Sequence, residues 1–132
     1  MKITADTNVL LRDVLLDDLR QAAIAAHVLK SADLVAVPTS VLCELVWVLG
    51  RGYKKPSHEI AAAIHQLIRS DNVVVERSVV EAGLRTLEAG GDFADGVVAN
   101  EGEWLGADEF VSFDKKAVSL LLSHGKRARL LV

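Results

Sequence analysis

The chain contains 132 residues, of which 51% are hydrophobic and 25% are charged, a composition expected of one globular domain with a substantial core. No apolar run reaches the roughly 20 residues of a membrane span, and no secretion signal precedes the first predicted strand, so we expect a cytoplasmic protein with no membrane partner. The formal net charge of −3 argues against a broad nucleic-acid-binding surface, unless a metal ion neutralises acidic residues gathered in one place.

The apolar pattern predicts strands and helices in alternation along the chain. The first strand begins at Lys2 and stops at Asp6, and the chain then turns over Thr7 and Asn8 into a helix. The other predicted strands span residues 34–38, 73–75, 109–113 and 129–132. The other predicted helices span residues 19–31, 41–49, 57–68, 78–90, 92–105 and 114–123.

Capping and breaking residues define several of these helix ends. Thr39 or Ser40 is expected to cap the helix at 41–49. The segment at 50–56, which begins with Gly50 and ends with Pro56, is expected to break that helix. Ser78 and Glu81 have the spacing of a capping box, in which two side chains satisfy the first free N–H groups of a helix.

The alternation of strands and helices predicts an α/β fold. We expect a three-layer α/β/α sandwich with a central, mostly parallel sheet of four to five strands, because parallel strands need helical crossovers that cover both faces. No repeat, linker or low-complexity segment interrupts the chain. Residues 1–132 are therefore predicted to form a single domain.

Three carboxylates follow predicted strands or open predicted helices. Asp6 ends the first strand, Asp95 lies in the first turn of the helix at 92–105, and Asp114 directly follows the fourth strand. In open α/β sheets, ligands bind where the strands end and the next helices begin, so we expect these three side chains at one edge. Taken singly, Asp6, Asp92 and Asp114 could each instead be a helix cap, and Asp95 could complete a capping box with Asp92.

Glu44 lies inside an apolar run and is too deep in its helix to cap it. Its helical neighbours are Val41, Trp47 and Val48, so the sequence predicts that its carboxylate points toward the buried face. A buried carboxylate needs a cation or hydrogen-bond donors. The alternative to a metal at this position is a buried salt bridge, with Arg12 as the partner.

Four carboxylates in one cavity require a compensating charge, because like charges raise one another's pKa. Ligation by oxygen atoms alone selects Mg²⁺, with Mn²⁺ as the alternative. Such a site hydrolyses phosphate esters by generating a hydroxide and holding the reacting oxygens. The four histidines lack the spacing of a zinc site and are expected to be surface or packing residues: His27, His58, His65 and His124.

Four acidic segments occur in a fixed order that resembles the PIN-domain ribonucleases, and most closely the VapC toxins of bacterial toxin–antitoxin pairs. These segments are DTNVLLR at 6–12, SVLCELVWVL at 40–49, DFADGVVA at 92–99 and SFDKKA at 112–117. The resemblance covers nearly the whole chain. One departure from the family pattern is Gly96, where a good helix former such as alanine is more frequent, and we expect the glycine to loosen its helix.

The resemblance implies a set of site residues. The metal-binding and catalytic quartet would be Asp6, Glu44, Asp95 and Asp114. Thr7 and Ser112 match the hydroxyl positions beside the acids, and Asp92 would be an auxiliary acid or a helix cap.

The resemblance also implies an activity and partners. The activity would be Mg²⁺-dependent endonucleolytic cleavage of RNA that leaves 5′-phosphate and 3′-hydroxyl ends. The chain would form a homodimer and bind a VapB-like antitoxin, whose C-terminal segment would cover the active site. A pocket of carboxylates suits an arginine or lysine presented by such an inhibitor.

Candidate RNA contacts come from a glycine-broken segment, where an aromatic residue lies among cations. These residues are Arg51, Tyr53, Lys54 and Lys55. A solvated turn is the alternative interpretation of the segment. Trp47, just before it, is expected in the core, with a dimer interface as the alternative.

Three other functions are compatible with clustered acids. A haloacid-dehalogenase-type phosphatase also has an aspartate after its first strand, but it needs a second aspartate where Asn8 stands. A phosphorelay receiver needs a phosphoacceptor aspartate after a middle strand, whereas Val75 is followed by Glu76 and Arg77. A non-catalytic PIN-like scaffold would be expected to lack some of the acids.

Overall fold

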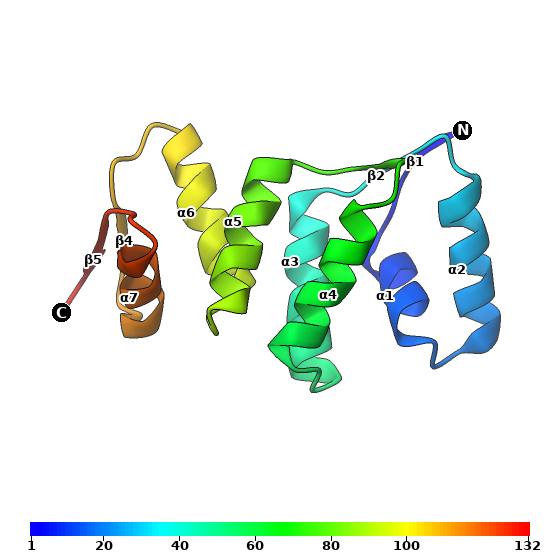
Figure 1. Cartoon of the computed structure of the whole chain (residues 1–132), viewed down its shortest axis with the longest axis horizontal. Helices are drawn as coiled ribbons and strands as arrows, with labels where there is room; N and C mark the ends of the chain where they lie inside the picture. The colour runs from blue at the N-terminus through cyan, green and yellow to red at the C-terminus, as the bar shows by residue number, and fades with distance from the viewer. The chain divides into compact units, whose positions relative to one another are not determined.

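The computed structural model describes all residues from Met1 to Val132. It contains five strands, seven α-helices and one π-helical segment, and it divides into two compact units, Met1–Glu76 and Arg77–Val132. Figure 1 labels the elements along the chain. None of the helices combines the length and apolar character needed to cross a lipid bilayer.

The first unit is built on a three-stranded parallel sheet in the order β1-β2-β3. Its strands are β1 (Lys2–Thr4), β2 (Leu34–Ala36) and β3 (Val73–Val74). Its helical segments are α1 (Thr7–Leu15), α2 (Leu19–Ser31), α3 (Thr39–Trp47), the π-helix η1 (Val48–Gly52) and α4 (Ser57–Ile68). The central strand is buried, since Val35 is fully covered and pairs with Ile3 on one side and Val73 on the other.

The second unit contains a pair of parallel strands, β4 (Phe110–Ser112) and β5 (Ala128–Leu130). Its helices are α5 (Arg77–Glu88), α6 (Phe93–Trp104) and α7 (Lys115–Ser123). Helices α5 and α6 pack closely against each other, and α7 contacts both strands. Parallel strands joined by helices in both units confirm the predicted α/β class, with the five strands divided between two sheets.

Helix ends differ from the sequence predictions in two places. Helix α3 begins at Thr39 after Pro38, and no side chain caps it, so the predicted cap by Thr39 or Ser40 is wrong. Helix α5 begins at Arg77, which places Ser78 inside the helix instead of at its cap. The predicted break within residues 50–56 is confirmed, because the helical run ends with η1 at Gly52. The chain then reverses at Lys54, where φ is 55°.

Gly96 has a packing role that the sequence did not reveal. It is buried where α6 meets α5, and a Cβ atom there would lie 2.4 Å from the carbonyl oxygen of Ala82 and 2.5 Å from Oγ1 of Thr86. Both atoms are confined, since Thr86 is buried and its hydroxyl donates a hydrogen bond to the Ala82 carbonyl. The glycine therefore allows the two helices to approach, although it has a lower helix propensity than alanine.

We expect the Gly96→Ala variant to lower the free energy of unfolding by about 1–3 kcal/mol, because the added methyl group forces α5 and α6 apart. The matched control is Gly102→Ala in the same helix, where a Cβ atom would meet nothing within 4 Å. That variant should be more stable than the parent by about 0.5–1 kcal/mol. Urea denaturation measures both, and a stabilising Gly96→Ala would contradict the packing role.

Candidate active site

Asp6 lies at the C-terminal end of β1 and caps α1. Its carboxylate accepts a hydrogen bond of 2.8 Å from the Thr7 N–H, and its backbone is extended, as expected of an N-cap residue. The Asp6 side chain is exposed, whereas Thr7 is buried. The cap is confirmed, and it leaves the carboxylate at the surface of the first unit.

Glu44 lies on the exposed face of α3, so the prediction of a buried carboxylate is wrong. The buried face of this helix is formed by Leu42, Leu45, Val46 and Leu49, which follow one another at helical spacing. In a run where every neighbour is apolar, composition does not reveal which face is inside. Arg12 is not the partner of Glu44 either, since its guanidinium donates a 2.8 Å hydrogen bond to Asp17.

In the second unit, Asp92 and Asp114 cap helices. The Asp92 carboxylate accepts from the Ala94 N–H at 3.2 Å. Asp114 follows β4, and its carboxylate accepts from the backbone N–H groups of Lys116 and Ala117 at 3.0 and 3.1 Å. Ser112 supports this turn, because its hydroxyl oxygen accepts from the Asp114 N–H at 3.0 Å.

Asp95 is the half-buried member of the acidic set. Burial raises the pKa of its carboxyl group above the usual value of 3.8, and the negative charges of Asp92 and Asp114 raise it further. Its carboxylate makes no capping-box hydrogen bond, so that alternative is not formed. The ionised form of Asp95 is thus disfavoured, and no cation offsets its negative charge. Carboxylate oxygens in such a setting suit a hard metal ion.

Two of the four predicted ligands lie in each unit. In the first unit, Asp6 caps α1 and Glu44 lies on α3, and these two helices contact each other. Asp95 and Asp114 lie in the second unit and interact electrostatically. No group of three or more His, Cys, Asp or Glu side chains is arranged to hold a metal ion. That these four side chains bind one metal site therefore remains a prediction.

The candidate RNA-binding residues are exposed on the segment that includes the end of η1 and the turn after it: Arg51, Tyr53, Lys54 and Lys55. Trp47, predicted to be in the core, is instead 62% exposed. The π-helix η1 was also not predicted, and no motif in the sequence indicates it.

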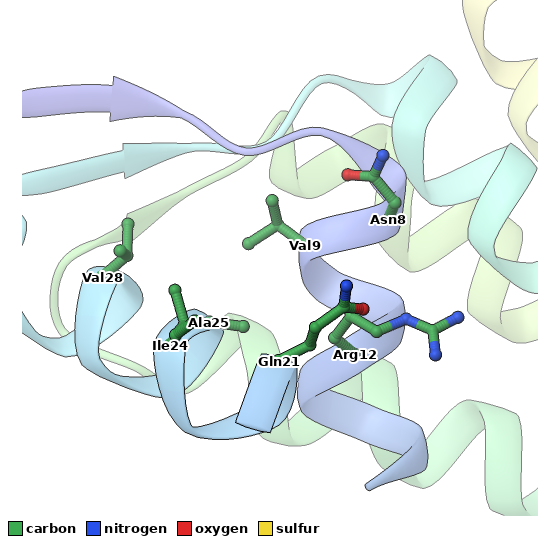
Figure 2. Close-up of a pocket in the computed structure, with 7 residues that line it drawn as sticks. All are labelled: Asn8, Val9, Arg12, Gln21, Ile24, Ala25 and Val28. Carbon is green, nitrogen blue, oxygen red and sulfur yellow. The ribbon is translucent and has the colours of Figure 1, made fainter. Parts of the chain in front are cut away.

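A groove lies between α1 and α2 in the first unit, with a volume of about 400 Å³. Figure 2 shows the residues that line it: Asn8, Val9, Arg12, Gln21, Ile24, Ala25 and Val28. None of these side chains is a carboxylate or an imidazole. The groove is therefore distinct from the predicted metal ligands.

Comparison with known families identifies the fold. The PIN-domain family matches residues 3–120, a span that includes all four predicted acids. No curated protein matches the chain significantly. PIN domains have a nuclease-type fold, and their members are generally nucleases that use divalent metal ions. The chain belongs to the PIN-domain family.

Proposed function

We propose that the chain is a metal-dependent endoribonuclease that acts as the toxin of a type II toxin–antitoxin pair. The observation that supports it most directly is Asp95, a half-buried acid with other acids beside it and no counter-charge. Such a group is costly to the fold unless it serves a ligand, and perturbed acids of this kind cluster at functional sites. The family match over residues 3–120 supports a nuclease reaction.

In this proposal, Asp6, Glu44, Asp95 and Asp114 hold Mg²⁺, with Mn²⁺ as an alternative. When bound, the metal supplies a hydroxide for attack on the phosphodiester and stabilises the leaving oxygen. The chain's own residues keep the ligands in place. Asp6 and Asp114 cap helices and Asp95 lies in a first helical turn, where the helix dipole favours negative charge. Glu44 is exposed and unpaired, which leaves its carboxylate available.

The substrate contacts follow from charge. Two divalent ions would change the formal charge from −3 to −3 + 4 = +1, which eases the approach of a polyanion. The cations Arg51, Lys54 and Lys55 would bind phosphate groups of the RNA, with Tyr53 among them. Thr7 and Ser112 would position the acids beside them, and Asp92 would add negative charge near Asp95.

The proposed partners are a VapB-like antitoxin and a second copy of the chain. A site rich in carboxylates attracts an arginine or lysine side chain, because guanidinium and carboxylate groups form strong paired hydrogen bonds. An antitoxin that presents such a side chain would compete with the metal for the same oxygens. Inhibition of cleavage by the antitoxin would then weaken as the metal concentration rises.

Removal of the metal tests the reaction class. We expect a 5′-labelled RNA mixture to be cut in the presence of Mg²⁺, to stay intact with a chelator in excess, and to be cut again when Mg²⁺ exceeds the chelator. The products should carry 5′-phosphate ends. Cutting that continues in the chelator would refute metal dependence. Hydrolysis of a phosphomonoester without RNA cleavage would favour the phosphatase alternative, and RNA binding without cleavage would favour a scaffold.

A further inference from the structure

The exposed face of α3 and η1 combines a carboxylate, an aromatic ring and a cation in one stripe. Glu44, Trp47 and Arg51 follow at spacings of three and four residues and are all exposed. Residues at these spacings share one face of a helix. The opposite face is buried, so the stripe is an ordered surface of the first unit and not a frayed end.

The segment after η1 folds back onto it. The Tyr53 N–H donates to the Val48 carbonyl at 3.2 Å, and the Lys55 N–H donates to the Leu49 carbonyl at 3.0 Å. Lys54 lies between them in the left-handed region, with φ of 55°. These hydrogen bonds hold Tyr53 and the two lysines close to the end of the helix that presents Trp47.

Arg12 interacts with the same segment from another helix. A side-chain hydrogen bond with Tyr53 and then the negative charge of Asp17 raise the pKa of the Arg12 guanidinium. Figure 2 shows this guanidinium pointing away from α2. The segment with Tyr53 is thus tied to α1, the helix that begins at Asp6, as well as to η1.

Trp47, an exposed tryptophan among charged side chains, suits one kind of ligand best. Leaving an indole in water forgoes the apolar burial that would stabilise it in a core. On this face and the segment after it, the exposed cations Arg51, Lys54 and Lys55 outnumber the one carboxylate, Glu44, which favours an anionic ligand. Trp47 has Glu44 three residues before it and Arg51 four residues after it. Proteins that bind single-stranded nucleic acid combine an aromatic ring that stacks on bases with cations that contact phosphates.

We propose that Trp47 is a base-stacking platform for single-stranded RNA, with Arg51, Lys54 and Lys55 binding the phosphates on either side. The platform takes its ligand class from the proposed ribonuclease function. Glu44 lies one helical turn from Trp47, so a base stacked on the indole places the neighbouring phosphodiester beside a predicted metal ligand. Trp47 is then a binding residue that sets where along the strand the cut occurs.

Binding to a non-cutting protein tests the platform. All variants are made on Asp6→Asn, and the probes are a labelled 12-nucleotide single-stranded RNA and the same backbone without bases. We expect Trp47→Ala to weaken binding of the base-bearing RNA by about 10-fold or more, Trp47→Phe to retain most of the affinity, and the abasic strand to be insensitive to both. Trp104→Ala is the matched control, because Trp104 is 76% exposed in the second unit and should have no effect.

Three results would overturn the platform. These are equal effects of Trp47→Ala and Trp104→Ala, equal affinity for the base-bearing and abasic strands, and a dimer that becomes a monomer in Trp47→Ala with no loss of RNA affinity. Cleavage by the parent is assayed separately. A parent that binds RNA through Trp47 but does not cut it overturns the nuclease proposal alone, whereas a parent that cuts RNA while Trp47→Ala binds normally overturns the platform alone.

Discussion

The Asp95→Asn variant is expected to unfold at a higher temperature than the parent at pH 7 and to lose RNA cleavage by about 100-fold or more. Burial, then Asp92 and Asp114, raise the pKa of the Asp95 carboxyl group in the folded chain. The folded state therefore binds the proton more tightly than the unfolded state. The contribution of Asp95 to stability is therefore largest below the unfolded pKa of 3.8 and is lost as the pH rises through the higher folded pKa. Asparagine does not ionise, so the variant does not lose this stability as the pH rises.

Thermal unfolding at pH 7 and at pH 3 measures the effect, and the stability advantage of the variant should vanish at the lower pH. Mg²⁺ should raise the melting temperature of the parent and leave that of Asp95→Asn unchanged, since a bound ligand stabilises only the state that binds it. Asp108→Asn, an exposed acid in the same unit, is the control and should behave like the parent. An Asp95→Asn protein that melts earlier than the parent at pH 7 would argue against an electrostatically strained acid.

The Asp6→Asn variant is expected to lose RNA cleavage by about 100-fold or more with its fold intact. Even residues that only orient a metal ligand cost about 10–100-fold when they are removed, and Asp6 is proposed as a ligand itself. Asparagine caps a helix as well as aspartate does, so α1 should keep its cap. Circular dichroism and the melting temperature check the fold, and gel analysis of labelled RNA measures the cleavage.

Asp18→Asn is the matched control for Asp6→Asn. Asp18 also caps a helix of the first unit, and its carboxylate accepts from the Gln21 N–H at 3.0 Å, but it has no proposed metal role. The control should cut RNA as fast as the parent. If Asp6→Asn cuts RNA at the parental rate, Asp6 is only a helix cap.

Some elements could be predicted because local chemistry determines them. Helix α2 spans Leu19–Ser31, as predicted, because Asp18 caps it and its small apolar residues repeat at helical spacing. Asp114 and Asp92 were also placed correctly, as residues that begin α7 and α6. In these cases, a short stretch of sequence contains the cause of the structure.

Other features depend on packing that the sequence does not display. The sequence predicts Glu44 and Trp47 on the buried side of their helix, because their neighbours in the run are apolar. A uniformly apolar run has no periodicity that would indicate which face of the helix is buried. Gly96 was expected to loosen its helix, but the closeness of α5 and α6 decides its role. In both cases, the missing information was which surfaces of the helices meet.

Binding of Mn²⁺, followed by its electron paramagnetic resonance signal, tests the central claim most directly. The claim is that the proposed quartet, Asp6, Glu44, Asp95 and Asp114, holds one and the same cation. We predict that Asp6→Asn and Asp95→Asn each weaken one and the same tight Mn²⁺ site by about 10-fold or more, while Asp18→Asn binds like the parent. If Asp95→Asn loses the ion and Asp6→Asn binds it normally, the site belongs to one unit and the proposed quartet does not exist.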